Sequence, residues 1–100
     1  MRLLEELYGP GLDLTGVEID PACVAAGRRF LDLPGKARVY AGVDARLFVN
    51  QAAGSWRLII VDAYSAQIYI PFQLATVEFF ARIRELLEEG GVVAVNVADP

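Results

Sequence analysis

The chain has 100 residues, of which 55% are hydrophobic and 22% are charged, and its formal net charge is −4. This length suits a single domain over residues 1–100, and the apolar share excludes a disordered chain and is typical of a sheet that helices bury on both faces. The nine Lys and Arg residues are scattered rather than gathered in a stripe, which argues against a nucleic-acid partner.

Membrane, disulfide and metal chemistry are not expected from this sequence. It lacks an apolar run of about 18 residues and a basic leader before an apolar stretch, so we expect no membrane partner and a cytoplasmic location. Histidine is absent and Cys23 is the single cysteine, so neither a disulfide nor a Cys–His metal site is predicted, and Cys23 is expected to fill the core. A general base that works near neutral pH would therefore be a carboxylate, a tyrosine or a lysine.

Short apolar runs alternate with longer helical stretches, which is the pattern of a parallel α/β sheet. A helix is predicted over Arg2–Tyr8, where leucines recur at helical spacing before the breaker cluster Gly9-Pro10-Gly11. The first strand is predicted over Leu12–Ile19. With Asp20 as its N-cap, the next helix is predicted over Pro21–Leu31, because proline suits the first helical position.

The middle of the chain repeats this order of strand and helix. A second strand is predicted over Ala37–Val43, and Asp44 is the predicted N-cap of a helix that ends near Gly54. The third strand, Arg57–Val61, is nearly all branched aliphatic and ends on Asp62.

The last third of the chain predicts a loop, a long helix and a strand. The loop covers Ala63–Pro71, and apolar residues at helical spacing mark one face of a helix from Phe72 to Leu87. Gly90-Gly91 are the predicted left-handed C-terminal cap of this helix, and Val92–Val97 is the predicted fourth strand.

Acidic residues stand at the ends of three of the four predicted strands. Right-handed crossovers would bring all four strand ends to one edge of the sheet, where these polar residues are expected to converge: Glu18, Asp20, Asp44, Asp62 and Asn96. Parallel α/β proteins bind ligands at this edge, and an acidic residue there commonly receives the hydroxyls of a ribose. The sequence therefore predicts a Rossmann-like parallel sheet with helices on both faces, and a nucleoside ligand.

Four motifs in the same order along the chain resemble spermidine synthase-like proteins, the polyamine aminopropyltransferases of the class I S-adenosylmethionine-dependent fold. The motifs are Val17-Glu18-Ile19-Asp20-Pro21, Asp44-Ala45-Arg46, Leu58 to Ser65, and the segment from Ile70 through Leu87 to Gly91-Val92. The resemblance spans nearly the whole chain. It implies a transferase that moves an aminopropyl group from decarboxylated S-adenosylmethionine to an amine.

The resemblance also implies roles for individual residues. A glutamate placed like Glu18 holds the ribose hydroxyls of decarboxylated S-adenosylmethionine or methylthioadenosine, and an aspartate placed like Asp44 contacts the adenine amino group. Asp20 and Ala45 complete the predicted cofactor-binding set. The cofactor implied is decarboxylated S-adenosylmethionine or S-adenosylmethionine, without a metal.

By the same resemblance, Asp62 is the catalytic base that takes a proton from the attacking amine, a task to which a buried carboxylate is suited. Tyr64 and Ser65 belong to the predicted substrate loop. Ser65 stands where aminopropyltransferases usually carry a second aspartate that binds the cationic amine. This departure leaves transfer of a methyl group from S-adenosylmethionine as an alternative reaction.

Two further departures concern the sheet. The family's central strand and the glycine-rich loop after it have no counterpart, and Met1 falls roughly where the following helix begins. Either the first and third strands pair directly, in the order two-one-three-four, or two half-sheets recruit a partner chain. Because open apolar sheet edges invite pairing, we expect a homodimer or a higher oligomer.

Each of these residues also has a purely structural interpretation. Asp20 and Asp44 are in positions where helix caps are expected, and Tyr64, Tyr69 and Phe72 are suited to pack a loop over the sheet edge. The alternative to a transferase is therefore a non-catalytic α/β module that binds no cofactor.

Overall fold

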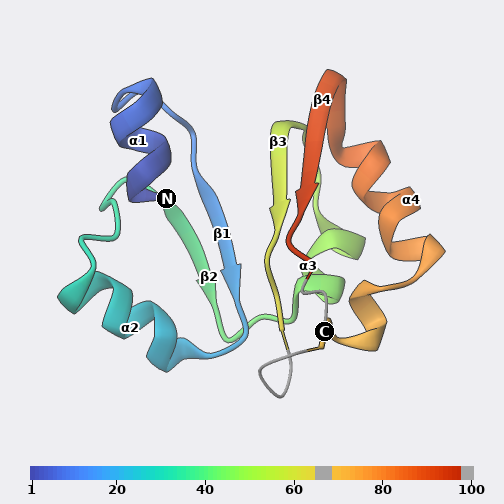
Figure 1. Cartoon of the computed structure of the whole chain (residues 1–100), viewed down its shortest axis with the longest axis horizontal. Coiled ribbons are helices and arrows are strands. Elements are labelled where there is room, and N and C mark those ends of the chain that lie inside the picture. Colours follow the sequence, from blue (N-terminus) through green and yellow to red (C-terminus); the bar gives the residue numbers. More distant parts are fainter. Residues whose placement is uncertain (65–68, 98–100) are drawn as a thin grey trace. The chain divides into compact units, whose positions relative to one another are not determined.

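The computed structural model describes residues 1–64 and 69–97, and the chain divides into two compact units, Met1–Ala45 and Arg46–Pro100. Each unit combines one pair of parallel strands with helices (Figure 1). Within the described residues, no helix is long and apolar enough to cross a membrane.

The first unit contains two helices and two strands. In chain order these are α1 (Arg2–Tyr8), β1 (Thr15–Glu18), α2 (Pro21–Phe30) and β2 (Arg38–Ala41). Strand β1 pairs in parallel with β2, and the register places Glu18 opposite Ala41 at the C-terminal end of the pair. Both strands are shorter than predicted, because hydrogen-bonded pairing extends over four residues of each.

Helix α2 begins as its sequence predicts. The side chain of Asp20 accepts a hydrogen bond from the backbone N–H of Ala22 at 2.9 Å, and Pro21 occupies the first helical position. This confirms the predicted N-cap, which satisfies one of the free N–H groups of the first turn. The expectation that Cys23 fills the core is wrong, because its side chain is exposed on this helix.

The second unit carries α3 (Ala45–Gln51), β3 (Trp56–Val61), the 3-10 turn η1 (Phe72–Leu74), α4 (Val77–Leu86) and β4 (Leu87–Val95). Helix α3 begins at the last residue of the first unit. Strands β3 and β4 pair in parallel from Leu58 opposite Val92 to Val61 opposite Val95. Helix α4 contacts β4, and Phe79, 2% exposed, is the most deeply buried side chain of the described residues.

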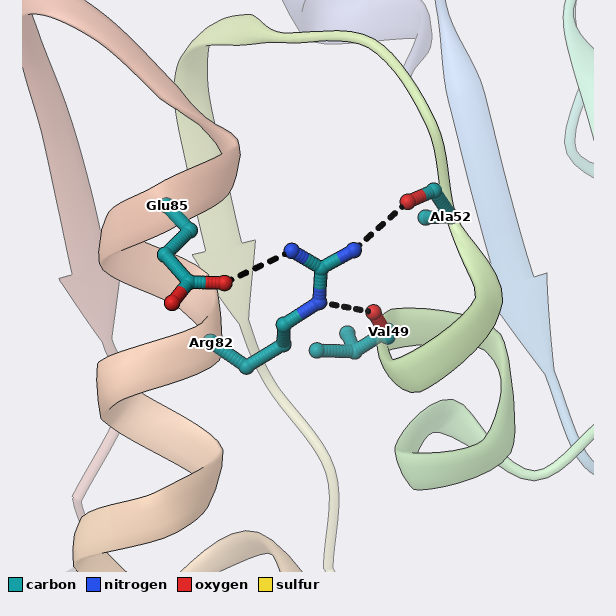
Figure 2. Close-up of polar contacts among 4 residues, drawn as sticks. All are labelled: Val49, Ala52, Arg82 and Glu85. Carbon is teal, nitrogen blue, oxygen red and sulfur yellow. Dashed lines mark hydrogen bonds and ion pairs between the residues drawn. The ribbon is translucent and has the colours of Figure 1, made fainter.

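Arg82 joins α4 to α3 and to the residues that follow it (Figure 2). Its Nε donates to the carbonyl oxygen of Val49 at 3.1 Å, and its Nη2 donates to the carbonyl oxygen of Ala52 at 2.8 Å. Its Nη1 pairs with Oε2 of Glu85 at 2.8 Å. Arg82 therefore binds carbonyl groups at the C-terminal end of α3, where the helix itself supplies no donors.

The long helix begins five residues later than predicted, because Thr76 caps it. Residues Phe72–Leu74 form a separate 3-10 turn, and the Thr76 hydroxyl oxygen accepts a hydrogen bond from the N–H of Phe79 at 3.1 Å. The same hydroxyl accepts a hydrogen bond from Arg46 Nη1 at 2.9 Å. Two donors on one oxygen fix the first turn of α4.

The prediction that Gly90-Gly91 cap this helix is wrong. Helix α4 ends at Leu86, and Leu87 already has extended backbone angles, so the chain passes directly into β4. Gly90 does adopt a left-handed conformation, with φ of 75°, but within a register shift between Trp56 and Leu58 of the neighbouring strand. These glycines therefore allow the shift of register between the two strands and do not end the helix.

The structure bears out an α/β protein built from parallel strands. The strands of the described residues form two separate sheets of two strands, in the orders β1-β2 and β3-β4. Both alternatives that the sequence offers for joining these pairs, a single sheet in the order two-one-three-four and recruitment of a partner chain, stay predictions.

Candidate functional site

Glu18 lies at the C-terminal end of β1, as predicted, and is half-buried. Its carbonyl oxygen accepts a hydrogen bond from the N–H of Gly42 at 2.8 Å, which continues the β1-β2 pairing beyond the last strand residue. Its side-chain Oε1 accepts the N–H of Asp20 at 3.0 Å. The backbone thus fixes both the strand end and one oxygen of this carboxylate.

Asp20 uses its carboxylate for the helix that follows. Oδ1 accepts the Ala22 N–H, and Oδ2 lies 3.7 Å from the thiol sulfur of Cys23, which donates to it. These contacts match the structural interpretation of Asp20 as a cap. The negative charge of Asp20 raises the pKa of the Cys23 thiol above its usual value, with smaller contributions from desolvation, from Glu18 and from the hydrogen bond to Asp20.

Asp44 and Ala45 lie where the chain passes from β2 into α3, and both are half-buried. Asp44 directly precedes the first residue of α3, the position where the sequence predicts an N-cap. Because β1 and β2 run in parallel, Glu18 and the segment leading to Asp44 leave the sheet at the same edge.

In the second unit, Asp62 directly follows β3, and its side chain is exposed rather than buried. Asn96 follows β4, and its Nδ2 donates a hydrogen bond to Asp62 Oδ1 at 2.9 Å. The Tyr64 hydroxyl donates to the carbonyl oxygen of Asn96 at 2.6 Å. Ser65 lies outside the described residues.

The structure thus brings the predicted residues together in two groups, one in each unit. Glu18 and Asp20 form the first group, and Asp62, Tyr64 and Asn96 form the second. The convergence of both groups on one rim stays a prediction. The sequence predicts that Asn96 lies at a strand end, but it does not predict a partner for its side chain. The signal for that partner is the pairing of β4 with β3, because it brings Asn96 beside the residue that follows β3, Asp62.

A hollow of about 200 Å³ lies in the first unit, and Glu18 lines it. Its other lining residues are mostly apolar: Met1, Gly16, Val17, Cys23, Val24, Gly27, Leu33 and Val39. Ligand pockets usually measure about 300–1,000 Å³, so this hollow is too small to enclose a nucleoside. The predicted ribose contact of Glu18 therefore rests on its position at the strand end rather than on this hollow.

The donor set of the described residues suits an organic ligand. No group of three or more His, Cys, Asp or Glu side chains among these residues is arranged to hold a metal ion. Carboxylates at strand ends accept hydrogen bonds from hydroxyl and amino groups, which are the groups that a nucleoside and an amine present.

The chain is similar to parts of three longer proteins that carry transferase names. The chain is 38% identical over 96 residues to a probable polyamine aminopropyl transferase of Bifidobacterium longum, covering 96% of this chain and 21% of that protein. It is 34% identical over 98 residues to a polyamine aminopropyltransferase of Vibrio vulnificus, covering 93% of this chain and 32% of that protein.

A third relative has a different transferase name. The chain is 32% identical over 97 residues to an N-terminal histidine N-methyltransferase of Emericella nidulans, covering 92% of this chain and 17% of that protein. The chain therefore spans a third or less of the length of each of these relatives. No family model matches the chain, and no solved structure matches it.

Proposed function

We propose that this chain is a Rossmann-like domain of an S-adenosylmethionine-related transferase, and that the reaction is aminopropyl transfer from decarboxylated S-adenosylmethionine to an amine. The four motifs and the similarity to two polyamine aminopropyltransferases support this proposal. A nucleoside and an amine as the small-molecule partners, and a cytoplasmic location, belong to the same proposal.

The observation that carries the proposal is the position of Glu18. Its carboxylate stands at the C-terminal end of β1, its carbonyl is fixed by Gly42, and the capped helix α2 begins three residues later. One carboxylate can accept hydrogen bonds from both hydroxyls of a ribose, and such charge-assisted bonds are about twice as strong as neutral ones. Asp44 leaves the same sheet edge and is the proposed contact of the adenine amino group.

Asp62 is the proposed base. A sulfonium ligand supplies an electrophilic carbon and a good leaving group. In the proposed step, the bond between the amine nitrogen and this carbon forms, the carbon–sulfur bond breaks, and the amine gives one proton to Asp62. Because the side chain of Asp62 is exposed, holding the amine in line with the carbon is the larger contribution that this site can make.

Methyl transfer from S-adenosylmethionine is the second candidate. Two observations favour it: Ser65 replaces the second aspartate of the amine site, and one relative is a histidine N-methyltransferase. The proposed nucleoside contacts of Glu18 and Asp44 are the same for both reactions, so the choice of ligand separates them.

Titration calorimetry with methylthioadenosine and with S-adenosylmethionine tests the proposal. We expect wild type to bind one of them, and Glu18→Ala to weaken binding at least about tenfold because a charge-assisted pair of hydrogen bonds is lost. Glu89→Ala, which removes an exposed glutamate of β4, is the matched control and should bind like wild type.

The preferred ligand decides between the two reactions. Binding of methylthioadenosine supports aminopropyl transfer, and preference for S-adenosylmethionine supports methyl transfer. If wild type binds neither ligand more tightly than millimolar, the non-catalytic module replaces the proposal.

A further inference from the structure

The geometry points to Asn96 as the positioning residue of Asp62: it holds one carboxylate oxygen so that the other faces the reacting amine. This inference rests on the proposed function, because it assigns Asn96 a task in the step for which Asp62 is the base. It adds a residue that none of the four motifs contains.

Three hydrogen bonds tie Asn96 to the end of β3 and the residues after it. Its backbone N–H donates to the carbonyl oxygen of Val61 at 3.0 Å, which extends the β3-β4 ladder by one step. Its side-chain Nδ2 donates to Asp62 Oδ1 at 2.9 Å. Its carbonyl oxygen accepts the hydroxyl of Tyr64 at 2.6 Å.

The side-chain bond makes the two oxygens of Asp62 different. The terminal torsion of an aspartate is broad and nearly two-fold, so an exposed carboxylate without a partner turns freely between equivalent orientations. With Oδ1 bound by Asn96, the plane of the carboxylate is set, and Oδ2 is the oxygen presented to a proton donor. A general base must lie within hydrogen-bond reach of the proton that it takes, so this orientation bears directly on the proposed step.

Tyr64 supports the same arrangement from the loop side. Its hydroxyl donates to the Asn96 carbonyl, so the bond links the residue after Ala63 to the end of β4. The placement of Tyr64 in a substrate loop stays a prediction, and the bond of its hydroxyl adds a role in holding Asn96. Asp62, Tyr64 and Asn96 form one connected group in the second unit.

The first test follows the contact itself and needs no activity. In two-dimensional ¹H–¹⁵N spectra of the full chain, the side-chain amide signals of Asn96 should shift when Asp62→Asn removes the charged acceptor. Those of Asn50, an exposed residue on α3, should not shift. Asn96 signals that stay in place in Asp62→Asn overturn the inference, whatever the enzyme does.

The second test separates positioning from folding. Asn96→Ala should lower kcat by about 10- to 100-fold, which is the loss of rate expected when a reacting group is misplaced. The KM for the nucleoside ligand should stay near that of wild type. Asn96→Gln keeps an amide donor and should restore part of the loss, and Tyr64→Phe should have a smaller effect of the same kind. Asn50→Ala is the matched control, and Trp56 fluorescence reports whether each variant folds.

The two proposals fail in different ways. If wild type transfers no group, the proposed function falls for this chain, and the amide signals still decide whether Asn96 holds Asp62. If wild type is active but folded Asn96→Ala keeps its full kcat, the positioning role is overturned while the proposed function stands.

Discussion

Arg82 donates from Nε to the carbonyl oxygen of Val49, and this single contact ties the middle of α4 to the end of α3 (Figure 2). Together with the bond to Ala52, it satisfies two partly buried carbonyl groups. Leaving such groups unpaired costs about 1–3 kcal/mol. We therefore expect Arg82→Ala to lower the free energy of unfolding by an amount in this range, measured by urea denaturation.

Two variants sharpen this prediction. Arg84→Ala, which removes an exposed arginine of the same helix, should leave the urea midpoint nearly unchanged. Arg82→Lys should fall between wild type and Arg82→Ala, because one ammonium cannot reproduce the planar fork of a guanidinium. Equal midpoints for Arg82→Ala and Arg84→Ala would contradict a stabilising role for the bonds from Arg82 to Val49 and Ala52.

The second prediction separates the two interpretations of Asp20. Asparagine caps a helix about as well as aspartate, whereas alanine does not, so Asp20→Ala should destabilise the chain by about 1 kcal/mol and Asp20→Asn should not. Thermal unfolding measures this difference. If Asp20→Asn nevertheless weakens binding of methylthioadenosine, the charge of Asp20 has a task beyond the cap. Unchanged affinity would leave Asp20 with the cap alone.

The third prediction concerns Cys23, whose thiol pKa is raised first of all by the charge of Asp20. The thiolate is the reactive form, and a raised pKa means that less of it is present at a given pH. At about pH 8.5, near the usual pKa of a free thiol, Cys23 should react with iodoacetamide more slowly than free cysteine does. Asp20→Asn should speed the reaction by lowering the pKa. A rate that Asp20→Asn leaves unchanged would show that Asp20 does not control this thiol.

The fourth prediction is association between chains. Leu58, Ile60 and Val92 lie on one face of the β3-β4 pair and are 41%, 54% and 58% exposed. Clustered apolar side chains of this kind mark association surfaces. Light scattering at micromolar concentration should therefore report a dimer or a larger assembly, and Ile60→Lys should shift it toward monomer. A monodisperse wild-type monomer would remove this expectation.

Much of the local structure could be predicted from the sequence, because its signals act over a few residues. Helix α1 has the predicted bounds, and the N-cap Asp20 with Pro21 behind it placed the start of α2. The apolar run before Asp62 located β3 to within one residue. In each case, one cap, one breaker or one uninterrupted apolar run determines the boundary.

The start and end of α4 and the partner of Asp62 could not be predicted, because other residues, near or far along the chain, determine them. Apolar residues recur at helical spacing from Phe72 onward, which predicts a helix that begins there. The helix begins only at Val77, because the Thr76 hydroxyl caps its first turn. Two glycines after a helix suggest a cap, yet α4 ends before them, since Leu87 is already extended. The partner of Asp62 lies 34 residues away, so only the pairing of β3 with β4 reveals Asn96.

The register shift between β3 and β4 restricts the adjacent positions 90 and 91 in different ways. A side chain at Gly90 would meet open space, so only its left-handed backbone restricts replacement, and asparagine or aspartate are the least costly substitutes. At Gly91, a Cβ would lie 2.9 Å from the carbonyl oxygen of Glu88 and 3.2 Å from that of Arg57. A saturation library should therefore admit a few residues at position 90 and glycine alone at position 91.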